Sequence, residues 1–203
     1  MFAKSVSTED IYQLPLAAFE GEIVVVDKVD STFHDAIRYL SSKKVIGFDT
    51  ESRPTFSADQ KPYGVSLLQL SGAEKAFLFR VKETGLHRRL ASLLANPKII
   101  KVGAAVHDDL HGLQKLQDFK PAGFVDLQRM VGDYGINDKS VKKMAAIILG
   151  VRISKTQQLS NWEAEHLSEP QQRYAATDAW ICREMYKKLL KSTQEPLKNE
   201  SHG

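Results

Sequence analysis

Short apolar runs that alternate with segments of helical periodicity limit this chain to the mixed α/β class of folds. Six runs have the length and β-branched composition of strands, namely 22–27, 44–50, 65–71, 75–81, 98–103 and 123–127. Apolar residues recur at helical spacing between and after them, namely in 31–42, 86–95, a segment starting near Val106, 140–149 and 169–191. Only a short turn at Gly72 separates the third run from the fourth, which predicts an antiparallel pair beside strands joined by helices. We therefore expect one mixed sheet flanked by helices.

Length and composition predict a single domain. The chain has 203 residues, and its hydrophobic (42%) and charged (26%) fractions are near the globular average. We expect the domain to occupy 1–203, with a core at 22–191 and a polar tail at 192–203. The formal charge of +3 is compatible with a polyanionic partner but does not identify one.

Cysteine content and hydropathy bear on the compartment. The single cysteine, Cys182, excludes an internal disulfide and a multi-cysteine zinc site, as expected in a reducing environment. No apolar run approaches the roughly 18 residues of a membrane span, and the first residues lack the apolar stretch of a signal peptide. A cytoplasmic, intracellular protein without membrane association is predicted.

Acidic residues occur at three places where a strand or a helix brings them together. Asp49 and Glu51 are two residues apart at the end of a strand, so both carboxylates face the same side. Tyr174 and Asp178 are spaced by four in a helical segment and share one face of it. Asp109 follows a strand that ends at a glycine. Each group by itself is better explained as a solvated strand end, a packing tyrosine or a first-turn helix acid.

Taken in order, the three segments resemble the three sequence motifs of RNase D-like and Werner-type 3′→5′ exonucleases. FDTE (48–51), VGAAVHDDLHGL (102–113) and YAATDAW (174–180) correspond to motifs I, II and III of the tyrosine-bearing DEDDy subclass, and SNWEAEHLSEPQQ (160–172) resembles the family's approach to motif III. In motif II, Asp109 is favoured over Asp108 because Gly103 precedes it by six residues and Leu113 follows it by four. The resemblance implies a ribonuclease H-like α/β fold.

The resemblance also implies a chemistry. Members of this family hydrolyse phosphodiester bonds from the 3′ end of DNA or RNA and release nucleoside monophosphates, using two divalent ions, Mg²⁺ or Mn²⁺. By resemblance, Asp49, Glu51, Asp109 and Asp178 hold the ions, with Asp49 shared between them, and Tyr174 orients the attacking water. Hard oxygen ligands suit these ions, and the six scattered histidines, His107 and His111 among them, argue against zinc.

Candidate contacts to nucleic acid are less specific. The densest basic cluster precedes motif III and is interpreted either as a phosphate-binding surface or as a solvated face; it comprises Lys139, Lys142, Lys143, Arg152 and Lys155. On the strand after motif I, Gln69 and Leu70 are candidates for shaping the nucleotide pocket. Aromatic residues that either stack on bases or pack internally are Phe56, Tyr63 and Trp162. Residues 53–64, with two prolines, predict a mobile loop after motif I.

Two alternatives remain open at this point. One is a catalytically silent nucleic-acid-binding module of the same fold, against which the presence of all five motif residues argues. The other is a related phosphodiesterase that cuts internally or acts on small nucleotides. The sequence does not discriminate DNA from RNA, because that choice depends on contacts to the 2′ hydroxyl.

Overall fold

A six-stranded mixed sheet forms the centre of the computed structural model, which describes residues 1–56, 59 and 61–192. The strands are β1 (Glu22–Val26), β2 (Val45–Ser52), β3 (Val65–Ser71), β4 (Lys75–Phe79), β5 (Ile100–Gly103) and β6 (Phe124–Asp126). Their order across the sheet is β1-β4-β3-β2-β5-β6. β3 pairs antiparallel with β2 and β4, whereas the β1–β4, β2–β5 and β5–β6 pairs are parallel. The predicted mixed sheet is confirmed.

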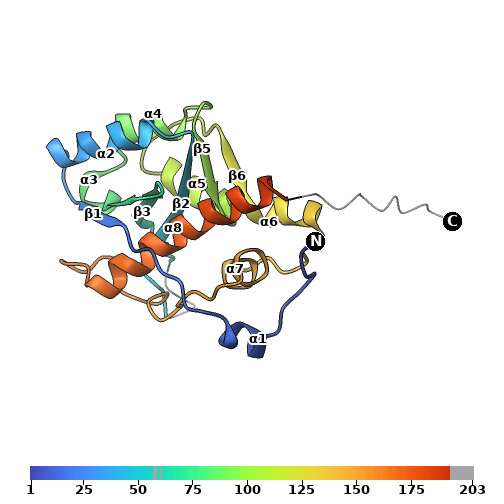
Figure 1. The fold of residues 1–203 in the computed structure, drawn as a ribbon. Helices are drawn as coiled ribbons and strands as arrows, with labels where there is room; N and C mark the ends of the chain where they lie inside the picture. The colour runs from blue at the N-terminus through green and yellow to red at the C-terminus, as the bar shows by residue number, and fades with distance from the viewer. Residues whose placement is uncertain (57–58, 60, 193–203) are drawn as a thin grey trace.

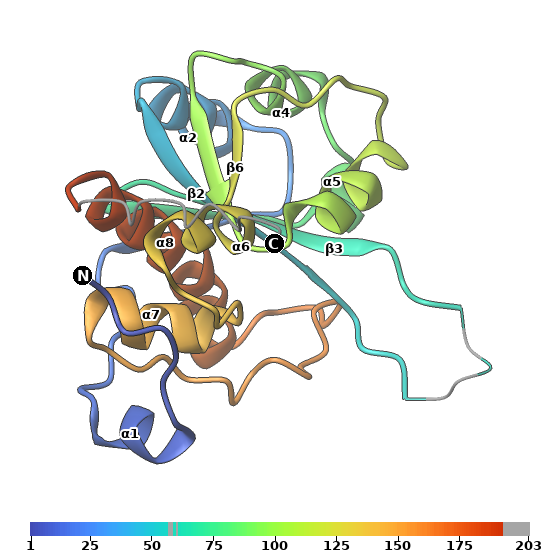
Figure 2. The same cartoon turned by 90° about the vertical axis from the view of Figure 1, so that its right-hand side faces the viewer.

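Helices cover both faces of this sheet (Figures 1 and 2). They are α1 (Thr8–Gln13), α2 (Ser31–Ser41), α3 (Val81–Thr84), α4 (Arg88–Leu94), α5 (Val106–Gln114), α6 (Leu127–Met130), α7 (Val141–Leu149) and α8 (Glu169–Leu190), with a 3₁₀ turn at Val131–Tyr134. In Figure 2, α2, α4 and α5 lie on one side of the sheet, and α7 and α8 lie on the other. α8 is the longest helix of the described residues and crosses β2, β3 and β5.

Strand alternation sorts the side chains of β2 between these two layers. Ile46 and Phe48 belong to the core under α2 and α4. Gly47 lies against α8, where a Cβ atom would come within 1.9 Å of the Ala179 carbonyl oxygen. Because side chains alternate along a strand, Asp49 and Glu51 share the α8 side with Gly47.

The expected helices and strands form with small shifts at their ends, and a few short elements were missed. The strand expected at 75–81 ends at Phe79, and the one-turn helix α3 begins two residues later, at Val81. The helix α1 was not predicted, because six residues are too few to show periodicity. The segment after α1 is fixed by a bridge between Leu16 and Arg152, whose guanidinium also donates to the Leu14 carbonyl at 3.0 Å.

Two predictions fall wholly or partly outside the described residues. The mobile loop predicted at 53–64 includes residues 57, 58 and 60, and the polar tail predicted at 192–203 includes 193–203, none of which the structure describes. Both stay predictions.

Candidate active site

Three carboxyl groups converge where β2 passes beneath α8. Asp49 and Glu51 come from β2 and Asp178 comes from α8, and one oxygen of each lies within 4.8 Å of the others. Asp178 is almost fully buried, and Asp49 and Glu51 are partly buried. The resemblance implied that Asp49 and Asp178, which are 129 positions apart in the chain, meet in one site, and the fold brings their carboxyl groups together.

The small residues of β2 and α8 explain how Asp178 reaches the strand. Gly47 leaves the backbone of β2 open to direct contact with the Ala179 carbonyl, and Ala175 and Ala179 are fully buried on the helix side. The start of α8 is fixed by a capping box, in which the Ser168 side chain accepts from the Gln171 backbone and the Gln171 side chain accepts from that of Ser168. A fixed start and a close crossing determine which turn of α8 faces Asp49.

Burial and mutual repulsion raise the pKa values of these carboxyl groups. Burial is the largest cause for Asp49, whose pKa lies well above its ordinary value, followed by the charges of Asp178 and Asp109. Burial and the neighbouring Asp49 raise the pKa of Glu51 to about 10. The pKa of Asp178 is raised by burial, an effect that Lys155 and Tyr174 oppose. A cation placed among these groups would remove the repulsion, as expected of a metal site.

Asp109 adjoins the three carboxyl groups but is not one of the set within 4.8 Å. The Thr50 hydroxyl donates to Asp109 Oδ1 at 2.5 Å, so the carboxyl is tied to the side chain between the two motif I acids. Burial raises its pKa to about 6, and its charge contributes to the raised pKa of Asp49. Asp108 is exposed. These positions favour Asp109 over Asp108 as the motif II residue.

The Tyr174 ring is packed beside the acidic cluster. Its side chain is 7% exposed and its ring centroid lies 5.9 Å from that of Trp162, which is fully buried. Burial, and then the charge of Asp178, raise the pKa of the phenol. The hydroxyl therefore keeps its proton at neutral pH.

Of the predicted basic cluster, Lys155 is the residue that the structure brings to the carboxyl groups. Its Nζ lies 3.5 Å from Asp178 Oδ2 and 5.6 Å from the centre of the Tyr174 ring. Lys143 instead pairs with Asp138 at 2.9 Å.

The remaining basic residues of the cluster lie elsewhere. Lys142 lies 4.8 Å above the Tyr12 ring of α1, and Arg152 holds the segment after α1. Lys139 is exposed before α7. Arg152, Lys142 and Lys143 thus have contacts within the chain that the sequence did not reveal.

Four further candidates occupy different environments. Gln69 lies in the middle of β3 with no exposed surface, so it cannot contact nucleic acid directly in this conformation. Trp162 is 1% exposed and serves as packing for Tyr174, not as a base-stacking platform. Tyr63 is partly buried with the Arg53 guanidinium 4.9 Å above its ring, and Phe56 is 80% exposed. Phe56 is the candidate with a free aromatic face.

A cavity of about 690 Å³ opens beside Asp109. It lies between α5, the end of β2 and the chain leading into β3, and its lining includes Thr50, Lys61, Tyr63, Asp109 and Lys115. Its size is in the range of small-ligand sites, and two lysines line it beside the acidic cluster.

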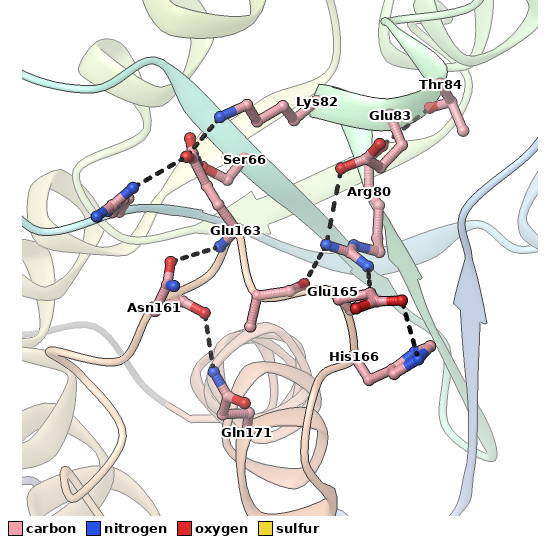
Figure 3. A network of polar contacts seen from close by, with 12 residues as sticks. Ser66, Arg80, Lys82, Glu83, Thr84, Asn161, Glu163, Glu165, His166 and Gln171 are labelled. Carbon is pink, nitrogen blue, oxygen red and sulfur yellow. Dashed lines mark hydrogen bonds and ion pairs between the residues drawn. The ribbon is translucent and has the colours of Figure 1, made fainter.

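The chain leading into α8 is held by a buried arginine that sequence reasoning missed (Figure 3). Arg80, 7% exposed after β4, donates to the carbonyl oxygens of Ala164 at 2.5 Å and Glu165 at 2.6 Å. Its guanidinium also lies 3.8 Å from Glu83. The anchored segment carries Trp162, so these bonds support the packing of the Tyr174 ring. Backbone acceptors leave no pattern in the sequence, which is why Arg80 gave no signal.

Glu163 connects the same segment to β3, α3 and the chain that follows β2. It accepts from Ser66 at 3.3 Å, pairs with Lys82, and lies 3.8 Å from Arg53 (Figure 3). These cations lower the pKa of Glu163, the hydrogen bond from Lys82 most of all. Because Arg53 also covers the Tyr63 ring, Glu163 links the approach to α8 with the chain between β2 and β3.

The donor set suits a hard divalent cation. The carboxyl oxygens of Asp49, Glu51 and Asp178 are close enough together to bind one ion, and no histidine or cysteine belongs to the group. No other cluster of three such side chains occurs in the part of the chain that the structure describes. Within that same part, no helix combines the length and the apolar character needed to cross a membrane.

Comparison with known proteins agrees with this geometry. Residues 24–194 match the family model described as 3'-5' exonuclease. The chain is 32% identical to the exonuclease mut-7 homolog of Homo sapiens over 89% of its length, and 28% identical to ribonuclease D of Gluconacetobacter diazotrophicus over 86%. It spans 23% and 44% of those two proteins.

Solved structures show the same fold. The Nibbler EXO domain of Aedes aegypti superposes with a TM-score of 0.74 at 24% identity, covering 86% of this chain and 91% of that one. This likeness shows that the six-stranded sheet and its helices have the same fold as that domain. Since the family model spans most of the chain and includes every motif residue from Asp49 to Asp178, the protein belongs to the 3′-5′ exonuclease family.

Proposed function

We propose that this chain is a metal-dependent 3′→5′ exonuclease that hydrolyses phosphodiester bonds and releases nucleoside monophosphates from the 3′ end of nucleic acid. The convergence of Asp49, Glu51 and Asp178 within 4.8 Å, beside the Tyr174 hydroxyl, is the observation that carries this proposal. Burial and then the charges of Asp178 and Asp109 raise the pKa of Asp49, and burial and then the charge of Asp49 raise that of Glu51, an arrangement that costs stability unless a cation is bound. A bound divalent cation would offset this cost in stability.

The cofactors proposed are two divalent ions, Mg²⁺ or Mn²⁺. When bound, they supply a water of lowered pKa and stabilise charge on the leaving 3′ oxygen. Asp49, Glu51 and Asp178 would hold them together with Asp109, whose carboxyl accepts a hydrogen bond from the Thr50 hydroxyl in this structure.

The side chains around the carboxyl groups have separate roles in this proposal. Tyr174 keeps its proton and orients the attacking water through its hydroxyl oxygen. Lys155, 3.5 Å from Asp178 Oδ2, is placed to contact a phosphate oxygen of the substrate once Asp178 turns to the metal. Burial of Tyr174 against Trp162 limits rotation of the ring and so supports the orientation of the water.

A nucleic acid is the partner proposed for the cavity next to Asp109. Lys61 and Lys115 line it and can neutralise backbone phosphates. Ribonuclease D of Trypanosoma brucei, whose structure was solved with the RNA U12, covers 86% of this chain with a TM-score of 0.74 at 21% identity. RNA is therefore the first substrate to test, with DNA beside it.

Labelled oligonucleotides provide the test. Single-stranded and duplex RNA and DNA, labelled at the 5′ or the 3′ end, are incubated with Mn²⁺ or with EDTA. Stepwise shortening of 5′-labelled strands and immediate release of labelled mononucleotide from 3′-labelled strands are expected with Mn²⁺ alone. Asp49→Asn is the matched inactive control. Internal fragments would instead identify an endonucleolytic phosphodiesterase, and binding without cleavage would identify a silent binding module.

A further inference from the structure

Gln69 is a buried polar residue without an evident structural role. Its side chain has no exposed surface, and neither its amide nitrogen nor its amide oxygen has a hydrogen-bond partner among the described residues. Leaving a buried amide unpaired lowers the stability of the folded protein. A leucine or methionine would fill the same space without this cost, so packing alone does not explain why the residue is a glutamine.

The sheet register directs Gln69 toward the acidic cluster. Gln69 on β3 is the cross-strand partner of Asp49 on β2, and Leu67, two residues earlier, is the partner of Glu51. Directly opposed residues of an antiparallel pair point to the same face, with Cβ atoms about 4.5–5.5 Å apart. Leu67 packs with Tyr174 on the α8 side. Gln69 therefore lies on the α8 side of the sheet, next to Asp49.

The cross-strand partner of Gln69 on its other side has no polar side chain. On β4 its cross-strand partner is Leu78, which packs on the α8 side with Ala175 and Ala176 of the helix above. The backbone groups of α8 are used by the helix itself. Among these neighbours Asp49 is the one with a side chain that can accept a hydrogen bond.

We propose that Gln69 is a positioning residue for the metal site: when divalent ions are bound, its amide NH₂, unpaired in this structure, donates to the Asp49 carboxylate and fixes the rotamer in which Asp49 binds them. Side chains that hydrogen-bond a metal ligand hold it in orientation, and their loss typically weakens metal affinity 10- to 100-fold. This inference rests on the proposed function, because it requires Asp49 to be a metal ligand. It also changes the expectation for Gln69 from a substrate contact to a support beneath the site.

Gln69→Met separates this proposal from a purely structural role. Methionine keeps the length and volume of the side chain and removes both polar atoms. Tyr39→Phe is the matched control, because the Tyr39 hydroxyl is also buried without a partner among the described residues but belongs to the opposite layer, against Phe77. Both variants should melt in EDTA at or above the wild-type temperature, since each removes an unpaired buried group.

The decisive readout is Mn²⁺ binding, measured by thermal shift and calorimetric titration of the full chain. We expect the Mn²⁺ dissociation constant of Gln69→Met to rise at least 10-fold while that of Tyr39→Phe stays at the wild-type value. With the oligonucleotide substrate, kcat at limiting Mn²⁺ should fall about 10-fold, KM should remain unchanged, and excess Mn²⁺ should restore most of kcat.

The possible results distinguish failure of the positioning role of Gln69 from failure of the proposed function. If Gln69→Met binds Mn²⁺ within threefold of wild type, the positioning role is overturned while the proposed function stands. If wild type itself shows no Mn²⁺ response, the metal site and this inference both fail. If Gln69→Met does not fold, Gln69→Leu is measured in the same way, and failure of both to fold would show that the amide has a structural role and overturn the proposal.

Discussion

The metal-site and the structural interpretations of Asp49 predict opposite effects of Asp49→Asn on the stability of the metal-free protein. Asparagine keeps the shape of the side chain and removes its charge. Two charges 4.8 Å apart, the outer limit for this cluster, repel by about 3 kcal/mol at an effective dielectric constant of about 20. Protonation already relieves part of that repulsion, because the pKa of Glu51 is raised to about 10. In EDTA we therefore expect Asp49→Asn to be as stable as wild type or more stable by on the order of 1 kcal/mol.

Metal should reverse the order of the two proteins. At a Mn²⁺ concentration 100 times Kd, wild type gains about 2.7 kcal/mol, equivalent to a rise in Tm of roughly 5–10 °C for a chain of this size. Asp49→Asn should lose most of this rise together with cleavage. Melting curves of both proteins in EDTA and in Mn²⁺ make the comparison. A variant that melts lower in EDTA yet keeps the full Mn²⁺ rise would show that Asp49 is a structural strand end, and the two-metal assignment would be wrong.

The pH dependence in EDTA gives an internal check on the same reasoning. A carboxyl group whose pKa is raised in the folded protein binds more protons there than in the unfolded chain, so stability is greatest at low pH and falls as pH rises. For Glu51 the window extends from about 4.5 to about 10. We expect wild type to lose stability across this range more steeply than Asp49→Asn, which lacks one of the repelling charges. Equal slopes would contradict the proposed coupling between Asp49 and Glu51.

Four further substitutions test separate parts of the structure. Tyr174→Phe should retain fold and Mn²⁺ binding and lower kcat roughly 10- to 1000-fold, the loss of one positioned hydrogen bond; unchanged turnover would make Tyr174 a packing residue. Asp109→Ala should abolish cleavage and Asp108→Ala should leave most of it, and the reverse result would move the motif II assignment by one residue. Burial lowers the pKa of Lys101 to about 8 from 10.5, so wild type should gain on the order of 3 kcal/mol between pH 8 and 10.5 relative to Lys101→Met, measured by urea unfolding; a constant difference would contradict that burial cost.

Much of the fold and of the candidate site could be predicted from local patterns in the sequence. Strand and helix periodicity predicted the mixed sheet, because apolar residues that recur every 2 or about 3.6 positions indicate which face of a strand or helix is buried. The local geometry of the motif residues could also be predicted. Their spacing places Asp49 and Glu51 on one face of a strand, and Tyr174 and Asp178 on one face of a helix. The resemblance of these segments indicated the family, which the matched residues 24–194 confirm, and with it the expectation that the segments meet in one site.

The contacts between segments were decided by the tertiary structure. Lys142, Lys143 and Arg152 resembled a nucleic-acid surface, but each has a contact within the chain, and Lys155 alone of that cluster lies against the carboxyl groups. A lysine in a sequence does not reveal its partner, because ion pairs and stacking form between residues far apart in the chain.

Gln69 and Arg80 show the same limit. The sequence predicts a substrate contact at Gln69, whereas β-sheet pairing buries it beside Asp49. Arg80 anchors the approach to α8 through backbone carbonyls. Both roles depend on which backbones come together when α8 crosses the sheet. Side-chain identity and spacing fix local geometry, whereas burial and partnership arise only from the packing of the whole chain.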